Sequence, residues 1–266
     1  MSEFVTTSRG DTVAYDRRGS GPALIFIAGA GPFRAIDPGT TETAELAAEQ
    51  GLTTIVYDRL GRGESPTDVR LSLDSELAAL AALIDVAGGS AVLCGHSSGC
   101  SIALKAATSG LAVNGLVLWE APLGPEDGGA EEWAAEVDRL IETGDPEGAL
   151  LHYMKDMPAE FRDGIRYAPM FTDLVAQVPS LRPDGESLAW AESAPLAQLL
   201  GDITVPVEVL MGEETFPVML QAADAICAAI PGATQKRMPG AMHSWDSAPM
   251  AAELVAFVTS SPQREL

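Results

Sequence analysis

The chain has 266 residues, of which 47% are hydrophobic and 20% are charged, so it can bury a large core and is not globally disordered. Its 16 basic and 38 acidic residues give a formal net charge of −22. A surface this acidic repels phosphate backbones and anionic lipids, which argues against nucleic-acid and membrane partners. The three cysteines give no disulfide framework, and no segment approaches the roughly 18 apolar residues of a membrane span, so we predict a cytoplasmic protein.

The first half of the chain alternates short apolar runs with helix-like segments. Phe4–Ser8 and Thr12–Arg17 flank the turn-forming pair Gly10-Asp11 and predict a β-hairpin. Apolar runs that end at glycine or a polar residue predict buried strands, and apolar residues spaced three and four apart between them predict helices. The predicted strands are Ala23–Ala28, Thr53–Tyr57, Ala91–Cys94 and Gly115–Trp119, and the predicted helices are Thr41–Gln50, Ser75–Val86 and Ser98–Thr108.

A long helix-like stretch, Asp127–Gly201, separates this half from the predicted strands Val205–Met211 and Thr234–Met238, between which Val218–Ile230 reads as a helix. The stretch is moderately enriched in methionine and aromatic side chains, and an ordinary loop of this length would be exceptional. We therefore predict an α/β fold with a mostly parallel sheet, helices on both faces and a helical cap over the carboxyl edge of the sheet. The predicted division is the first part of the core in 1–122, a helical cap in 123–203 and the second part of the core in 204–266.

The segment Gly95-His96-Ser97-Ser98-Gly99 directly follows one predicted strand and directly precedes one predicted helix. Glycine at Gly95 and Gly99 removes Cβ atoms that would crowd a sharp strand-to-helix turn, so the Ser97 hydroxyl can stand exposed at the sheet edge. The Ser98 N–H then opens the helix, where free donors and a partial positive charge suit a developing oxyanion. We interpret Ser97 as a catalytic nucleophile.

With this motif in this context, the sequence resembles the α/β-hydrolase superfamily over nearly its whole length. Tyr57–Ser65 is similar to the family's loop after the fourth strand, where the acid, here Asp58, has an architectural role. Ala28–Gly31 lies where the family usually has His-Gly followed by a residue of the oxyanion hole, and here alanine replaces that histidine. The resemblance implies that the N–H groups of Ala30 and Ser98 form the hole.

The general base is expected among the three histidines, because a serine hydroxyl needs a neighbour that accepts its proton. His96 lies inside the turn motif and is expected to point away from the hydroxyl beside it. His152 belongs to the helical stretch. His243 follows the last predicted strand, in a segment that resembles the family's loop for the catalytic histidine, so we predict that His243 is the base.

The acid that supports the histidine departs from the commoner family pattern. The usual place, after the seventh strand, reads Gly212–Thr215, with Thr215 where the acid is expected and Glu214 adjacent. The other known place, after the sixth strand, falls in Leu118–Pro122 and contains Glu120. This arrangement is similar to haloalkane dehalogenases with the acid after strand six and to zearalenone-type lactone hydrolases. We favour Glu120 and keep Glu214 as the alternative acid.

Together these residues predict acyl transfer to water, with a small-molecule ester or lactone bearing an apolar group as substrate and with no cofactor or metal. Serine in place of aspartate at the turn argues against dehalogenase and epoxide hydrolase chemistry. The cysteines beside it, Cys94 and Cys100, are expected in the core. A hydrolase-like binding protein, or a lyase or perhydrolase using the same pocket, remains the alternative, since one fold hosts many activities.

Overall fold

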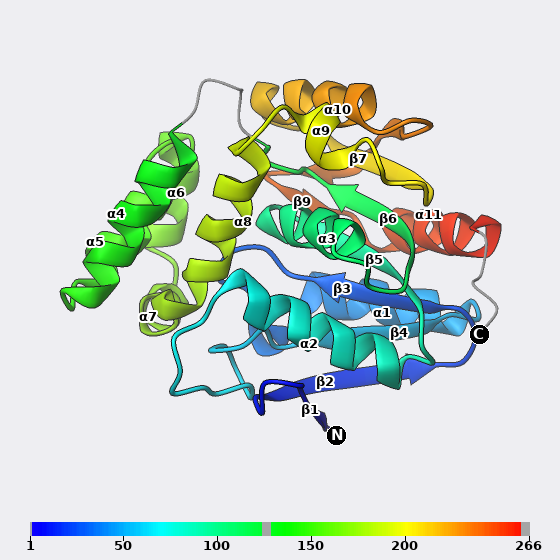
Figure 1. The fold of residues 1–266 in the computed structure, drawn as a ribbon, viewed down its shortest axis with the longest axis horizontal. Coiled ribbons are helices and arrows are strands. Elements are labelled where there is room, and N and C mark those ends of the chain that lie inside the picture. The colour runs from blue at the N-terminus through cyan, green and yellow to red at the C-terminus, as the bar shows by residue number, and fades with distance from the viewer. Residues whose placement is uncertain (1, 124–128, 262–266) are drawn as a thin grey trace.

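The computed structural model describes residues 2–123 and 129–261, so residues 124–128, which fall at the start of the predicted cap, lie outside the described residues. A nine-stranded sheet with the order β1-β2-β4-β3-β5-β6-β7-β8-β9 runs through the molecule (Figure 1). Neighbouring strands from β4 to β8 are parallel, and the pairs β1–β2, β2–β4 and β8–β9 are antiparallel, which confirms the mostly parallel sheet. The strands are β1 (Glu3–Thr6), β2 (Thr12–Gly19), β3 (Ala23–Ile27), β4 (Thr53–Tyr57), β5 (Ala91–His96), β6 (Val113–Trp119), β7 (Val207–Glu214), β8 (Thr234–Ala241) and β9 (Ser244–Trp245).

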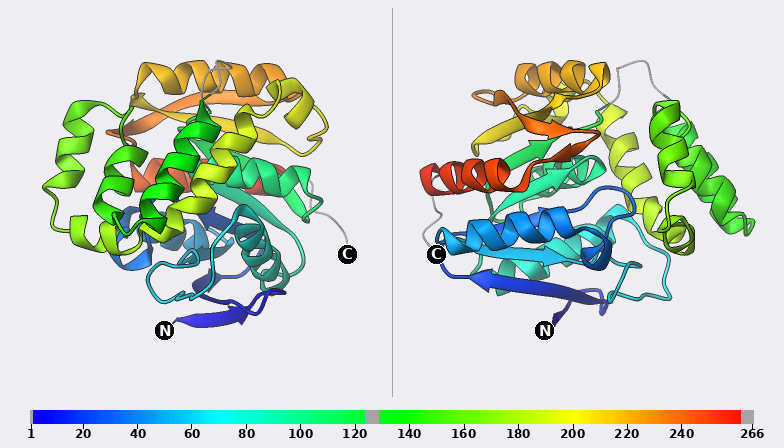
Figure 2. Two further views of the ribbon diagram at one scale, coloured as in Figure 1. Left: turned by 60° about the vertical axis from the view of Figure 1, so that its left-hand side comes forward. Right: turned by 180° about the vertical axis from the view of Figure 1, so that it is seen from behind.

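Helices cover both faces of the sheet (Figure 2). One face packs against α2, α3 and α10, and their buried residues join those of the strands in one hydrophobic cluster. The opposite face packs against α1 and α11 in a second cluster. Burial on both sides explains why β3 is a continuous apolar run and why β4 consists of β-branched and aromatic residues. These core elements are η1 (Arg34–Ile36), α1 (Pro38–Glu49), α2 (Leu73–Val86), α3 (Ser98–Thr108), α10 (Pro217–Ala229) and α11 (Ser247–Ser260).

The chain between β6 and β7 forms a group of helices that we call the helical insertion; most of them lie beside the sheet on the left of Figure 1, whereas the last one lies against α10. Its side chains form a third hydrophobic cluster that includes Val137, Leu150, Leu174 and Val178. The division of the chain at 122 and 203 stays a prediction. The helices are α4 (Ala130–Glu142), α5 (Pro146–Tyr153), α6 (Ala159–Arg166), α7 (Phe171–Ala176), η2 (Val178–Leu181), α8 (Arg182–Glu192) and α9 (Leu196–Leu200).

The end of the chain differs from the sequence expectation. Strand β8 runs to Ala241, beyond the predicted end at Met238, and turns back into β9. Helix α11, which the pattern analysis did not predict, buries Met250, Leu254 and Val258 against the α1 side of the sheet. These two elements hold the segment around His243 at the edge of the fold.

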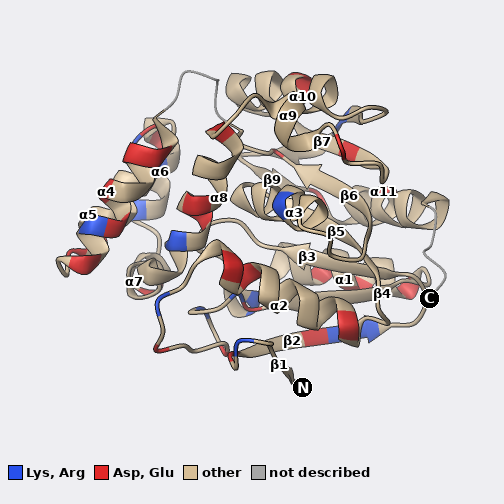
Figure 3. Cartoon of the chain, in the orientation of Figure 1, with Lys and Arg blue, Asp and Glu red and all other residues tan. Residues whose placement is uncertain are grey.

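Acidic residues are spread over the helical insertion, α2 and β2 and are not gathered at one place (Figure 3). Within the part of the chain that the structure describes, no helix combines the length and the apolar character that crossing a bilayer requires.

The acidic side chains of Glu208 and Glu253 make the free energy of unfolding depend on pH. Burial, followed by the nearby charge of Glu253, raises the pKa of Glu208 on β7 from 4.5 to about 7. The folded chain therefore retains a proton that the unfolded chain releases, and the associated stability is present below pH 4.5 and lost as the pH rises through about 7. We expect Glu208→Gln to raise Tm at about pH 8 by about 2–4 °C, or about 1 kcal/mol after allowance for solvent screening.

The Tm difference between Glu208→Gln and the unaltered chain should shrink when unfolding is measured at about pH 5, where Glu208 is protonated in the folded chain. Glu213→Gln, an exposed position on the same strand, provides the control and should show no such pH dependence. An equal effect of Glu208→Gln at both pH values would contradict the prediction.

Candidate active site

Ser97 occupies a sharp turn between β5 and α3, at φ 54° and ψ −130°. Residues other than glycine seldom adopt positive φ, and here the conformation lifts the side chain out of the line of the sheet. A Cβ atom at Gly95 would lie 2.6 Å from Cys100 Cα, and one at Gly99 would lie 2.3 Å from the Ile27 carbonyl oxygen. Close packing therefore requires both glycines, which confirms the prediction that Cβ atoms at these two positions would crowd the turn.

His243 lies in a two-residue turn between β8 and β9. Ala241 and Ser244 pair across this turn, and the two residues between them, Met242 and His243, have φ values of 51° and 68°. Two-residue hairpin turns with positive φ at both positions usually contain Asn-Gly, whereas here they contain Met-His. The turn places the His243 ring at the sheet edge where Ser97 stands.

Glu120 follows β6 directly, at φ 45°, and its side chain is 1% exposed. Its Oε2 lies 2.5 Å from His243 Nδ1, and its Oε1 accepts a hydrogen bond from the Gly212 N–H at 3.0 Å. Burial alone would raise the pKa of Glu120, but the hydrogen bond with His243, joined by others, holds this pKa below its ordinary value. The alternative acid, Glu214, is exposed at the end of β7.

The carbonyl of His243 is held by two ring N–H donors. His96 Nε2 donates to it at 2.8 Å, and Trp119 Nε1 donates at 3.4 Å. Burial, and next the nearby His243, lowers the pKa of His96 to about 4, so the ring is neutral and can keep the proton on Nε2. His96 thus supports the turn that carries His243. The sequence prediction had set His96 aside as pointing away from Ser97 and did not foresee this contact.

The non-glycine residues with strained backbone conformations include the predicted site residues. Among the described residues, the non-glycine residues with positive φ are Ser97, Glu120, Met242 and His243. Such conformations cost about 1–3 kcal/mol each and persist where the surroundings impose them, typically at functional sites. Three of the four are the residues that the sequence proposes as nucleophile, acid and base.

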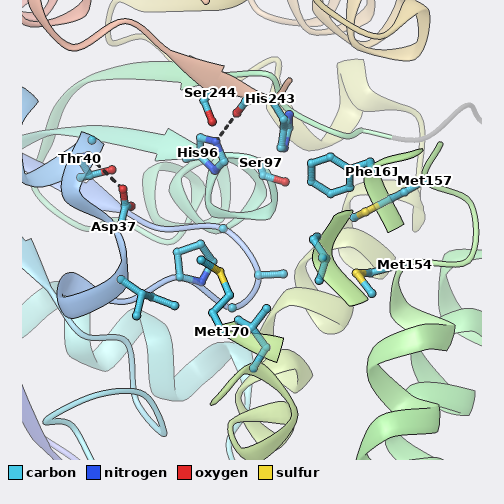
Figure 4. Close-up of a pocket in the computed structure, with 18 of the residues that line it drawn as sticks. Asp37, Thr40, His96, Ser97, Met154, Met157, Phe161, Met170, His243 and Ser244 are labelled. Atoms are coloured by element: carbon cyan, nitrogen blue, oxygen red, sulfur yellow. Dashed lines mark hydrogen bonds between the residues drawn. The ribbon is translucent and has the colours of Figure 1, made fainter. Parts of the chain in front are cut away.

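Two cavities meet at Ser97. One, of about 420 Å³, extends toward the Ala30 loop, α1 and the insertion helices α5 to α7, and the other, of about 670 Å³, extends toward α4, α8 and the start of α10. Both are lined by Ser97 and His243, together with Tyr153, Met157 and Phe161 of the insertion. In Figure 4 the side chains of Ser97, His243 and Phe161 converge on one space.

Among the residues that the structure describes, no hydrogen bond joins the Ser97 hydroxyl to the His243 ring. In enzyme structures without bound substrate, hydrogen bonds between reacting side chains are often long and shorten only when substrate binds. The arrangement places the His243 imidazole between the Ser97 hydroxyl, with which it lines both cavities, and the Glu120 carboxylate, which it contacts. This order fits proton transfer from Ser97 to His243.

The loop after β3 lies against Ser97. A Cβ atom at Gly29 would lie 2.8 Å from Ser97 Cβ. The Gly29 carbonyl oxygen accepts a hydrogen bond from Arg62 Nη1 at 2.5 Å. In a planar trans peptide the N–H of the next residue points the opposite way, so the Ala30 N–H faces away from Arg62. Ser98 is the first residue of α3, and its N–H lacks an intrahelical acceptor.

The other residues that the sequence singled out lie apart from this chemistry. Asp58 is buried, accepts from the N–H groups of Arg34 and Glu64 and pairs with the Arg34 guanidinium, so it holds its own loop together. Cys94 and Cys100 are buried, which confirms their place in the core. His152 lies in α5 of the insertion, and its carbonyl accepts from the Trp133 ring.

No group of three or more His, Cys, Asp or Glu side chains within residues 2–123 and 129–261 is arranged to hold a metal ion.

The sequence does not predict a buried cluster of charges behind the Gly29 loop, in which Asp184 of the insertion contacts Arg59, Arg62 and Ser98. The two arginines were visible within the Tyr57–Ser65 motif, but no pattern in the sequence marks Asp184.

A model of the alpha/beta hydrolase family matches residues 24–257. The chain belongs to the α/β-hydrolase family. The resemblance inferred from the Ser97 turn motif is thereby confirmed, and the hydrolase shares its fold with many solved structures. No functionally curated protein matches it.

An alpha/beta hydrolase from Sphaerobacter thermophilus is 28% identical, has a TM-score of 0.82, and the match covers 96% of this chain and 99% of that chain. A thermophilic esterase from Thermogutta terrifontis is 21% identical, with a TM-score of 0.65 and coverage of 97% and 96%. An esterase from Rhodococcus sp. is 19% identical, with a TM-score of 0.66 and coverage of 98% and 99%. The likeness to the two esterases shows a common fold.

Proposed function

We propose that this α/β-hydrolase is a serine hydrolase that cleaves a carboxylic ester or lactone through an acyl-enzyme. The observation that carries the proposal is the short contact, 2.5 Å, between His243 Nδ1 and the buried Glu120 carboxylate, with Ser97 and His243 lining the same cavities. A carboxylate at Nδ1 fixes the tautomer in which Nε2 can accept the proton of the serine hydroxyl. It also stabilises the imidazolium that forms when the proton moves.

In the proposed mechanism, Ser97 Oγ attacks the carbonyl carbon while His243 accepts the hydroxyl proton. The N–H groups of Ala30 and Ser98 donate to the oxyanion, each contributing about 3 kcal/mol of transition-state stabilisation. His243 then passes the proton to the leaving alcohol, and the C–O bond breaks. Water attacks the acyl-enzyme with His243 again as base, which releases the acid and restores the Ser97 hydroxyl.

The two cavities suggest a substrate with a sizeable group on each side of the scissile carbonyl. With Ser97 at their junction, one cavity would hold the acyl part and the other the alcohol part of an ester, or both arms of a lactone ring. The first cavity is lined by Met154, Met157 and Met170, flexible side chains that adapt to apolar groups. The second also has Lys155 and Glu192 on its wall, so it can accept a partly polar group.

The proposal is tested with p-nitrophenyl esters of short and medium acyl chains. We expect a burst of p-nitrophenol of about one equivalent per chain, followed by turnover, and a higher kcat/KM for the octanoate than for the acetate. Ser97→Ala should show neither burst nor turnover above background. Absence of both in the unaltered chain, with no effect of Ser97→Ala, would contradict the proposal and favour a ligand-binding protein or a non-hydrolytic enzyme in this pocket.

A further inference from the structure

Four charged side chains are buried together between the core and the insertion. Arg59, Arg62 and Asp184 are each 0% exposed, and Glu76 is 1% exposed. Arg59 Nε contacts Glu76 at 3.0 Å, and the two guanidiniums face the two carboxylates, so the cluster has no net charge. Burying this many charges is costly unless each is paired and hydrogen-bonded, so the geometry of the cluster is tightly constrained.

Asp184 is the contribution of the insertion to this cluster. It lies on α8, and its Oδ1 accepts from Arg59 Nη1 and from Ser98 Oγ, both at 2.6 Å. Its Oδ2 accepts from Arg62 Nη2 at 2.9 Å. The carboxylate therefore links both arginines to the residue that directly follows Ser97.

The arginines reach from Asp184 to the loop after β3. Arg59 Nη1 donates to the carbonyl oxygen of Ala28 at 3.1 Å, and Arg62 Nη1 donates to that of Gly29 at 2.5 Å and that of Pro32 at 3.3 Å. These bonds fix the plane of the peptide between Gly29 and Ala30, because its carbonyl oxygen is drawn into the cluster. Rotation of this peptide would turn the Ala30 N–H away from the cavity and remove a donor.

We propose that Asp184 is a positioning residue for the oxyanion hole: through Arg62 it orients the peptide that carries the Ala30 N–H, and through Ser98 Oγ it holds the residue that supplies the second N–H. The inference rests on the proposed function, because it concerns how the proposed donors are held. It makes α8 part of the catalytic architecture rather than only a cover over it. Asp184 does not contact the reacting atoms and acts through its neighbours.

A second ion pair between insertion and core offers a matched control. Asp138 of α4 pairs with Arg70 of the core and with Arg182 at the start of α8. Asp138 is half-buried. Among the residues that the structure describes, it is not one of those that line either cavity, and it contacts neither the Gly29 loop nor Ser98. If ion pairing merely attaches the insertion to the core, Asp138→Asn and Asp184→Asn should behave alike.

The test uses a fluorophosphonate, which needs no knowledge of the substrate. Ser97 Oγ forms a bond to phosphorus, fluoride leaves, and the hydroxyl proton passes to His243, while the phosphoryl oxygen occupies the oxyanion hole. We expect Asp184→Asn to lower the second-order labelling rate by about 10- to 100-fold, which is less than the roughly 10²- to 10³-fold effect of removing an oxyanion donor, because the donors are displaced and not removed. Asp138→Asn should label within about twofold of the unaltered chain, and Ser97→Ala should not label.

The pH dependence of labelling separates the proposed role from general loosening of the site. Because Glu120 and His243 are untouched, Asp184→Asn should lower the rate without moving the pH midpoint of labelling. Hydrolysis of p-nitrophenyl esters should show the loss in kcat with KM within about threefold, since the cavities keep their walls. A shifted midpoint, or an equal fall in labelling for Asp138→Asn, would overturn the proposal.

Folding is checked by circular dichroism. Should Asp184→Asn not fold, Ser98→Ala decides, because it keeps every ion pair and removes the bond from Ser98 Oγ to Asp184 together with the hydrogen bond between the side chains of Ser98 and Tyr153. It should label about 3- to 10-fold more slowly, and a rate equal to that of the unaltered chain would overturn the proposal. Failure of the unaltered chain to label would instead contradict the proposed function. Normal labelling of both the unaltered chain and folded Asp184→Asn would contradict only the role of Asp184.

Discussion

Ser97→Ala and His243→Ala should each lower kcat for a p-nitrophenyl ester by about 10⁶-fold, and the double variant should lose no more than either alone. The reason is that a nucleophile and its base act as one unit, so that removing either removes the whole proton-coupled attack. Both side chains line both cavities, which places them where one substrate can contact the pair.

Variants of the same residue types elsewhere in the fold control for disturbance of the site. Ser101→Ala removes a buried hydroxyl from the next turn of α3, and His152→Ala removes a histidine from the insertion. Each should leave kcat within about twofold, since neither takes part in proton transfer. Additive losses in the double variant, or a comparable loss for His152→Ala, would show that Ser97 and His243 do not work together.

Glu120→Gln should lower kcat by about 10³- to 10⁴-fold, while Glu214→Gln should leave it within about twofold. Glutamine has nearly the shape of glutamate but no charge, so His243 would lose the partner that fixes its tautomer and stabilises its protonated form. Glu120 faces His243 Nδ1 at 2.5 Å, whereas the Glu214 side chain is exposed at the end of β7.

The pH profile of kcat/KM provides a second readout for the acid. Without the negative charge of Glu120, protonated His243 is less favoured, so the rising limb of the profile should move to lower pH in the residual activity of Glu120→Gln. The profile of Glu214→Gln should coincide with that of the unaltered chain. A large loss confined to Glu214→Gln would reassign the acid to the position after the seventh strand.

Much of the core could be predicted because its signals are local. Thr53–Tyr57 and Ser98–Thr108 agree with the structure at both ends, since a buried strand consists of β-branched and aromatic residues and a helix after a glycine turn has a clear start. The Ser97 turn could be predicted because its two glycines are required: a Cβ atom at either position would lie 2.6 Å or less from a backbone atom. Glu120 could be favoured because an acid directly after a buried strand needs a partner.

The remaining features depend on contacts between distant segments. Asp184 meets Arg62 across 122 residues of chain, and a single aspartate in a polar helix carries no sign of burial. The turn at Met242-His243 lacks the Asn-Gly signal of a two-residue hairpin, because its conformation is imposed by the bonds from His96 and Trp119 to the carbonyl. The cavities likewise arise only when the insertion packs against the core, because residues of both line them.

The meeting of two chambers at one serine hydroxyl has a consequence for the fate of the acyl group. In the proposed reaction the alcohol would leave one chamber while the acyl group stays attached in the other, so the vacated chamber becomes the route by which an acceptor arrives. The walls that select the leaving alcohol would then also select what replaces it. Small alcohols added to the medium would compete with water there, and the balance between hydrolysis and transesterification would follow the size of the emptied chamber.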